Sequence, residues 1–117
     1  MADAARRHMP PVLKYTPVFL AIHRRGRWVR GHHVSVGWLA REAGAGRVGI
    51  RTRRGLKGAV IRNRLKRQVR AQLRTRALSV RAGVDVLIVI HPKHLPIAAD
   101  MLGAELVKAW SRGHLHC

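Results

Sequence analysis

The segment Val84–Ile90, with the sequence VDVLIVI, constrains the fold of this chain more than any other stretch. Six of its seven residues are apolar and five are β-branched, a composition typical of a β-strand. A strand with apolar side chains on both faces has to be covered on both faces, as in the middle of a sheet. The segment therefore predicts a central strand, and the rest of the chain has to supply what covers it.

An amphipathic helix is expected before this strand, from about Ala59 to Leu78. Its apolar residues recur at every fourth position, the spacing of one helix face: Ile61, Leu65, Val69, Leu73 and Ala77. A parallel row is entirely basic and consists of Arg62, Lys66, Arg70 and Arg74. Like charges four residues apart destabilise a helix by about 0.2–0.5 kcal/mol per pair, and residues 51–76 contain no acid. The row therefore favours polyanion binding over the alternative of a merely solvated face.

A first helix is expected between Thr16, a suitable N-cap, and Gly26, which can close the helix in a left-handed conformation. Val18, Phe19 and Ile22 fall on one face of this helix. Phe19 is the only phenylalanine of the chain. The sequence favours core packing for its ring, and the alternative is a surface on which a nucleobase stacks.

A last helix is expected from Ala98 to Trp110, with Asp100 in its first turn, where the helix dipole favours an acid. Residues 112–117 are expected to fray. Residues 1–12, which contain two adjacent prolines and no periodicity, are expected to form a mobile arm. The buried side of the last helix is expected to carry Met101, Leu102, Leu106, Ala109 and Trp110.

The stretch after the first helix alternates like a strand. Val34, Val36 and Trp38 are separated by smaller residues, which predicts a strand that is buried on one face. Trp28 is expected to build the core or its rim, with base stacking as the alternative. Residues 40–46 end in glycine-rich turn chemistry and predict a hairpin connection to the next strand.

That next strand is expected at Arg47–Arg53, where apolar and basic residues alternate. The inward face would carry Val48, Ile50 and Thr52. The other face would carry the three arginines Arg47, Arg51 and Arg53. No acid is expected beside these arginines across the sheet, so the alternation predicts a surface that binds external anions.

The charge balance identifies the class of partner. The chain contains 24 Lys and Arg against 5 Asp and Glu, a formal charge of +19. Such a charge belongs with proteins that bind nucleic acid or, less often, anionic membranes. Membrane binding is disfavoured because the basic helix lacks bulky aromatic residues on its apolar side. The hydrophobic content of 47% is enough for a core, so the basic residues are expected on the surface of a folded domain.

At 117 residues the chain fits one domain. The elements above predict an α+β fold in which helices pack on a mixed sheet, in the order α-β-β-β-α-β-α. The single cysteine, Cys117, cannot form an internal disulfide, and no apolar run is long enough for a signal peptide or a membrane span. We therefore expect a cytoplasmic protein.

The sequence offers no recognisable catalytic constellation. Its five carboxylates are not paired at a spacing typical of acid–base catalysis or of a two-metal site. The eight histidines are scattered, and the adjacent His32 and His33 would point to opposite faces of a strand. His114, His116 and Cys117 could bind a metal, but they fall in the tail that is expected to fray. We expect no catalytic residue and no metal site on the protein itself.

The segment Ala59–Arg67, AVIRNRLKR, resembles the signature of the protein subunit of bacterial ribonuclease P. The resemblance extends over roughly residues 13–112 and includes Gly26 after the first helix and Asp85 in the apolar strand. It implies a fold of the ribosomal protein S5 domain 2 type. It also implies that the protein assists a catalytic RNA, which cleaves the 5′ leader from precursor tRNA with Mg²⁺ that the RNA binds.

The resemblance assigns residues to two RNA surfaces. The leader would lie in a cleft between the first helix and the sheet, formed by Phe19, His23, Arg51, Arg53 and Arg54. The catalytic RNA would contact Arg62, Asn63, Arg64, Lys66, Arg67 and Arg70. The implied partners are therefore the ribonuclease P RNA and precursor tRNA, with no obligate protein partner. The alternative function is that of a general basic RNA-binding or ribosomal protein without a role in ribonuclease P.

Several positions depart from the family pattern, including residues 55–58, where the lysine and glycine usual before the Ala-Val pair are rearranged. His23 stands where the first helix usually carries a second aromatic residue, and Gly37 lies near the position of another expected aromatic. Arg51 replaces a small hydroxyl residue on the cleft strand. These changes shift the expected leader contacts from base stacking toward phosphates.

Overall fold

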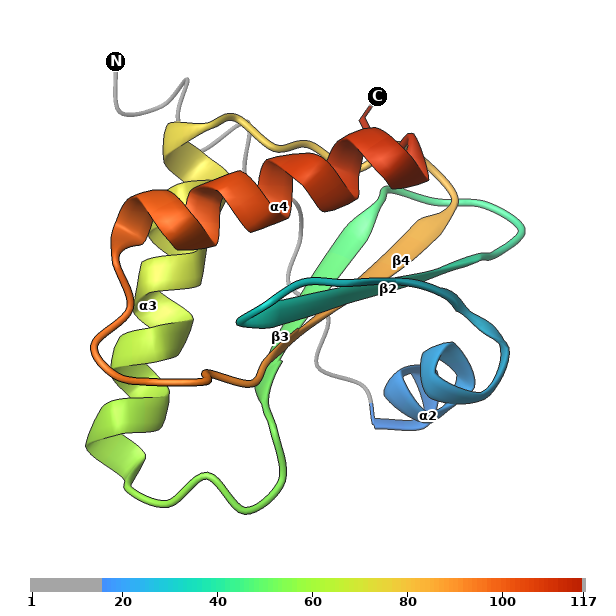
Figure 1. Cartoon of the computed structure of the whole chain (residues 1–117). Coiled ribbons are helices and arrows are strands. Elements are labelled where there is room, and N and C mark those ends of the chain that lie inside the picture. The colour runs from blue at the N-terminus through green and yellow to red at the C-terminus, as the bar shows by residue number, and fades with distance from the viewer. Residues whose placement is uncertain (1–15, 117) are drawn as a thin grey trace.

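The computed structural model describes residues 16–116, which form a four-stranded sheet and three helices (Figure 1). The elements are α2 (Thr16–Arg25), β1 (Arg27–Arg30), β2 (Val34–Ala40), β3 (Arg47–Thr52), α3 (Ala59–Thr75), β4 (Val84–Ile90) and α4 (Ala99–Gly113). This order confirms the predicted α+β arrangement. The arm expected at residues 1–12 lies outside the described residues. Among the described helices, none is long and apolar enough to cross a membrane.

β4 lies between β2 and β3 in a sheet of order β1-β2-β4-β3, which confirms the predicted central strand. Its side chains alternate between two cores. Val86 and Ile88 pack into a large core with α3 and α4, whereas Leu87 joins a smaller core with Phe19 and Ile22 of α2. Figure 1 shows α4 and α2 on opposite sides of the sheet. β4 is therefore apolar on both faces because helices pack against both faces of the sheet.

The connection at residues 40–46 is not the predicted hairpin. β2 pairs antiparallel with one edge of β4, and β3 pairs in parallel with the other edge. The hairpin is formed instead by β1 and β2, through residues 31–33. A period-two pattern identifies residues that share a face, but it does not identify the neighbouring strand. The parallel pair β3 and β4 is joined by α3, because parallel strands need a long crossover.

β2 is buried on both faces, and the prediction of a single buried face is wrong. Val36 faces the large core. On the other face, the Ser35 hydroxyl lies 2.7 Å from Nε2 of His91. Gly37 lies under the ring of Trp28, so close that a Cβ atom on Gly37 would come within 2.5 Å of Trp28 Cε2. The small residues of β2 are therefore covered by partners rather than by solvent.

α3 ends at Thr75, before the predicted end at Leu78. A strict four-residue repeat drifts by about 40° per step around a helix with 3.6 residues per turn. Only the middle of the stripe is therefore buried, at Leu65, Val69 and Leu73. Ile61 is 38% exposed at one end of the stripe. At the other end Ala77 lies outside the helix with a φ of 49°, and Leu78 enters the core instead.

Gly113 and Leu115, which fall in the tail that was predicted to fray, are buried in the domain. α4 continues to Gly113, and Leu115 is fully buried. The Leu115 N–H donates to Trp110 O at 3.1 Å, and the Arg81 N–H donates to Leu115 O at 2.7 Å. Met101, which was expected on the buried side of α4, is 40% exposed. The other members of that predicted side are buried: Leu102, Leu106, Ala109 and Trp110.

Candidate nucleic-acid interface

A groove runs between α2 and the sheet. One part of the groove is a hollow of about 380 Å³, and a second hollow has a volume of about 320 Å³. His23, Arg53 and Val89 line both hollows, so the two form one continuous surface. The first hollow is also lined by Leu20, Arg51, Thr52 and Arg54. The second is also lined by Trp28, Arg30, Ser35 and His91.

Phe19 supports the groove from below. Its ring is only 7% exposed and packs with Ile22 and Leu87 in the smaller core, which agrees with the core packing that the sequence favoured. Phe19 lines neither hollow. The guanidinium carbon of Arg51 lies 5.4 Å from the centre of the Phe19 ring, within range of a cation–π interaction. Phe19 therefore positions an arginine of the groove, and its own ring is not open to a base.

Arg53 and Arg54 follow β3 where the chain turns toward α3. The Arg53 N–H donates to Ile90 O at 2.8 Å, which extends the parallel pairing by one residue beside the groove. Gly55 then turns the chain with a φ of 90°, a conformation that glycine adopts without strain. Arg51, Arg53 and Arg54 are all exposed. Within residues 16–116 none of the three has an ion-pair partner.

Arg47 lies on the same face of β3 but has a partner. It is the register partner of Asp85 on β4, and its Nε and Nη2 donate to the two oxygens of Asp85 at 2.8 and 2.9 Å. Arg41 donates to the same carboxylate at 2.6 Å. The hydrogen bonds with Asp85 raise the pKa of Arg47. The prediction that Arg47 binds external anions is wrong, because the parallel pairing places an acid beside it.

An aromatic stack lines the second hollow. The rings of His23 and Trp28 are stacked, with centroids 5.2 Å apart and an angle of 24° between their planes. The Trp28 Nε1–H donates to Ile22 O at 3.3 Å, which holds the indole in place. Trp28 is the register partner of Gly37, so β1 supplies the aromatic ring that the family pattern places near Gly37 on β2. A tryptophan paired with a glycine across a hairpin is the signal that could have revealed this stack.

Ser35 and His91 form a polar pair in the same hollow, which the sequence reasoning missed. Burial lowers the pKa of His91 from its usual value near 6.5, so the ring is neutral at pH 7. The neutral pair can donate or accept a hydrogen bond. Among the described residues no carboxylate orients the His91 ring, so the pair lacks the third member of a catalytic triad. The arrangement suits recognition of a polar ligand.

The exposed surface of α3 holds the other predicted RNA contacts. Asn63, Arg64, Arg67 and Arg70 are exposed. Arg62 and Lys66 are half-buried, and Nη1 of Arg62 donates to Leu56 O at 3.0 Å, which ties α3 to the connection that precedes it. Both ion pairs within residues 16–116 use Asp85, so no acid neutralises a basic side chain of α3 there. This charge is available to a polyanion.

Three histidines from two segments that are distant in the sequence lie together in the structure. His32 and His33 precede β2, and His94 follows β4. Each offers a potential ligand nitrogen, and these atoms lie within 4.8 Å of one another. His114 and His116 are exposed near the C-terminus, and Cys117 lies outside the described residues.

Comparison with known proteins agrees with this architecture. The chain matches the family Ribonuclease P over residues 10–114. It is 35% identical over 85 residues to the ribonuclease P protein component of Microcystis aeruginosa. The aligned region covers 68% of this chain and 71% of that protein. The RNase P protein of Staphylococcus aureus has a TM-score of 0.74 at 18% identity, with 91% and 97% of the two chains covered. The RNase P protein of Thermotoga maritima has a TM-score of 0.68 at 24% identity, with 82% and 91% covered.

Proposed function

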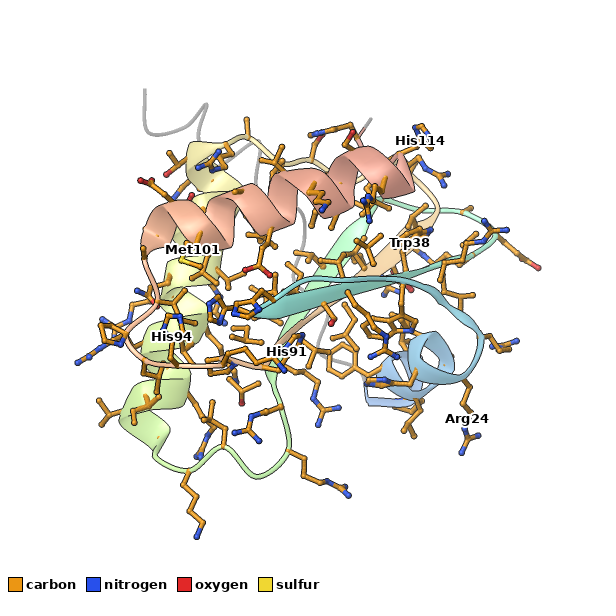
Figure 2. All side chains as sticks on the ribbon, in the orientation of Figure 1. Arg24, Trp38, His91, His94, Met101 and His114 are labelled. Carbon is orange, nitrogen blue, oxygen red and sulfur yellow. The ribbon has the colours of Figure 1, made fainter. Side chains whose placement is uncertain are left out.

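The chain belongs to the ribonuclease P protein family, and from this premise we propose how it takes part in tRNA maturation. It is the protein component of an endoribonuclease and associates with the RNA of that enzyme. We propose that the groove holds the 5′ leader of precursor tRNA while α3 binds the catalytic RNA. The proposal rests on three arginines that lead from the groove to α3 and have no ion-pair partner within residues 16–116: Arg51, Arg53 and Arg54. Figure 2 shows nitrogen-tipped side chains projecting into solvent along this connection.

The groove offers both kinds of contact that single-stranded RNA uses, which are cations for phosphates and aromatic rings for bases. Arg51 and Arg53 would contact leader phosphates. The stacked rings of His23 and Trp28 border the same surface and would receive a base. This arrangement modifies the expectation of phosphate contacts alone, because Trp28 restores an aromatic surface.

α3 would contact the catalytic RNA through its exposed side chains. Guanidinium groups suit this role because they bind phosphate oxygens with two parallel hydrogen bonds. Arg62 also has a structural role, since it donates a hydrogen bond to the Leu56 carbonyl in the connection that precedes the helix. Arg64 and Arg67 are exposed and make no such bond within the described residues, so their loss should affect RNA binding rather than folding.

The protein would supply position rather than a reacting group. In this proposal the RNA binds the Mg²⁺ that hydrolysis requires, and no residue of this chain enters the bond-breaking step. A leader held in the groove fixes the scissile phosphate relative to the RNA, and such positioning can lower a reaction barrier substantially. Because the catalytic RNA and precursor tRNA are the proposed partners, we place the protein in the cytoplasm.

Reconstitution with the ribonuclease P RNA of the same organism tests this proposal. Cleavage is measured at low Mg²⁺ for two precursor tRNAs, one with a long leader and one with a single-nucleotide leader. We expect the protein to stimulate cleavage of the long-leader substrate more strongly. Arg53→Ala should reduce that stimulation for the long leader alone, whereas Arg67→Ala should reduce it for both substrates.

Arg112→Ala is the matched control, because it removes an exposed cation from α4, away from both proposed surfaces. It should leave both rates unchanged. Absence of any stimulation by the wild-type protein would refute the proposed role. Equal losses on both substrates in Arg53→Ala would refute the assignment of the groove to the leader.

A general RNA-binding protein is the alternative function. It would bind any structured RNA of similar size with similar affinity. Competition between ribonuclease P RNA and an unrelated folded RNA separates the two functions, because the proposal requires a clear preference for the first.

A further inference from the structure

His32, His33 and His94 form a cluster that the proposed function does not use. His32 and His33 lie between β1 and β2, and His94 lies in the connection from β4 to α4, where Figure 2 labels it near His91. The rings of His32 and His94 each meet the ring of His33 edge-on, with centroids 4.6 and 4.7 Å away. We propose that these three imidazoles bind a divalent transition metal of the Zn²⁺ class.

His33 provides the observation that points to a ligand. Its side chain is completely buried, and its Nδ1 accepts the N–H of Lys93 at 3.1 Å. Its Nε2 is also buried and has no hydrogen-bond partner in the described part of the chain. Buried polar atoms are nearly always paired, so this nitrogen calls for a partner that the protein does not supply. A metal ion between the three rings is such a partner.

The other two histidines give the ion access. His32 and His94 are exposed, so an ion can reach the cluster from solvent and their side chains are free to adjust. The three potential ligand atoms lie within 4.8 Å of one another. Zinc–nitrogen bonds are about 2.0–2.1 Å long, so the exposed rings have to move slightly toward the ion. Three histidines leave the fourth position of a tetrahedral site to water.

Binding has a defined consequence for His33. Because Nδ1 accepts the Lys93 N–H, the hydrogen of the neutral ring lies on Nε2 in the metal-free protein. A metal at Nε2 needs the lone pair of that atom. The ring hydrogen therefore moves to Nδ1 through solvent exchange, and the hydrogen bond from Lys93 is lost. The exposed connection around Lys93 would shift when the metal binds.

The surroundings suit a cation that prefers nitrogen. Glu105 lies behind the cluster, and its Oε1 accepts the backbone N–H groups of His33 and Val34 at 2.8 and 3.2 Å. Its other oxygen is buried without a partner in the described residues. Through these bonds Glu105 holds the backbone of His33 in place, and its carboxylate adds negative charge near the ion. Imidazole suits Zn²⁺, Cu²⁺ and Ni²⁺, whereas Mg²⁺ prefers oxygen, so the Mg²⁺ of the RNA reaction would not compete.

A bound metal would join two connections that are distant in sequence. It would link the bend before β2 to the segment after β4, and these two segments lead to Ser35 and His91 in the groove. The metal would therefore fix one end of the groove. This inference does not depend on which RNA the groove holds.

Titration of the chelator-treated protein with Zn²⁺ tests the site through thermal unfolding and through competition with a chromophoric chelator. At about 100 times the dissociation constant, Zn²⁺ should raise the unfolding midpoint by on the order of 10 °C. His32→Ala and His94→Ala should each weaken Zn²⁺ binding about tenfold or more, at least the effect of losing an outer-shell partner. Both residues are exposed, so the variants should keep the metal-free unfolding midpoint of the wild type.

The C-terminal group of His114, His116 and Cys117 supplies the matched control. A variant with His114→Ala, His116→Ala and Cys117→Ser should bind Zn²⁺ as the wild type does, and the amide signal of Lys93 should shift on titration. Loss of binding in this variant, with binding kept in His32→Ala and His94→Ala, would overturn the proposal. A wild-type protein that does not bind Zn²⁺ would overturn it as well.

Discussion

Arg47 begins β3 and Arg53 directly follows it, yet these two arginines along β4 have opposite environments. Arg47 lies beside Asp85 on β4 and makes two hydrogen bonds to its carboxylate. Farther along the same face, Arg51 lies beside Val89, and Arg53 borders both hollows of the groove. Neither Arg51 nor Arg53 has an acidic partner within residues 16–116.

This contrast separates structural arginines from arginines that are available to RNA. The residue type and the strand are the same, so neither decides the role. The neighbour on β4 decides it, since one end of β4 presents a buried carboxylate and the other end presents apolar and neutral residues. An arginine with a buried acidic partner stabilises the domain, and one without such a partner can bind a phosphate.

Asp85→Asn should have the largest effect of these variants, and it should act on stability at the Arg47 end of β3. The substitution removes the charged acceptor that Arg41 and Arg47 share. The free energy of unfolding should fall by about 2–3 kcal/mol, as expected when charge-assisted hydrogen bonds lose their acceptor. Urea unfolding measures the change. Weaker leader binding by a variant of unchanged stability would show instead that Arg47 belongs to the RNA surface.

Arg53→Ala should have the next largest effect, and it should act on binding rather than folding. The affinity of the holoenzyme for a long-leader precursor should fall about tenfold, since a charge-assisted contact contributes on the order of 1.5 kcal/mol. The free energy of unfolding should stay within about 0.5 kcal/mol of the wild type, as is usual for an exposed side chain. Arg47→Ala is the control. It should lower the free energy of unfolding and leave the affinity for the long-leader precursor unchanged.

Phe19→Leu should have a smaller effect at the same end of the strand. Leucine keeps an apolar side chain in the smaller core but removes the ring under Arg51. Stability should fall by less than about 1.5 kcal/mol. Leader affinity should fall about two- to fivefold, because a cation–π interaction contributes about 0.5–1 kcal/mol. An unchanged affinity would mean that Phe19 does not position Arg51.

The smallest expected effect is a change in the salt dependence of leader binding between the wild type and Arg53→Ala. Each phosphate contact to a single strand contributes about −0.7 to the slope of the logarithm of affinity against the logarithm of salt concentration. Arg53→Ala should therefore make the slope shallower by about 0.7, and Arg47→Ala should leave it unchanged. Equal slopes for the wild type and Arg53→Ala would argue against a phosphate contact.

The sequence predicted the elements well wherever one local pattern decided them. The apolar run of β4 required a central position, and the four-residue repeat of α3 required one buried face. Strand pairing was harder, because the alternation in β3 does not reveal that its neighbour is β4 rather than β2. The buried C-terminus was missed for a similar reason, since Leu115 packs through contacts with Trp110 and Arg81 that no local pattern contains.

The site residues also divide into those that a local pattern predicts and those that depend on strand pairing. The basic face of α3 and the exposed Arg53 could be predicted because they depend on residue type and spacing. The pairing of Arg47 with Asp85 and the position of the Trp28 ring over Gly37 could not be predicted, because each depends on the register between strands. The histidine cluster was hidden too, since His94 reaches His33 only after β4 has paired with β2.

Site-specific crosslinking tests the division into two RNA surfaces most directly. In a Cys117→Ser background, Arg54→Cys places a photoreactive probe at the groove, and Arg67→Cys places one on α3. In the holoenzyme with precursor tRNA, the probe at position 54 should label leader nucleotides, and the probe at position 67 should label the catalytic RNA. Labelling of the catalytic RNA alone from position 54, with none in the leader, would contradict the account.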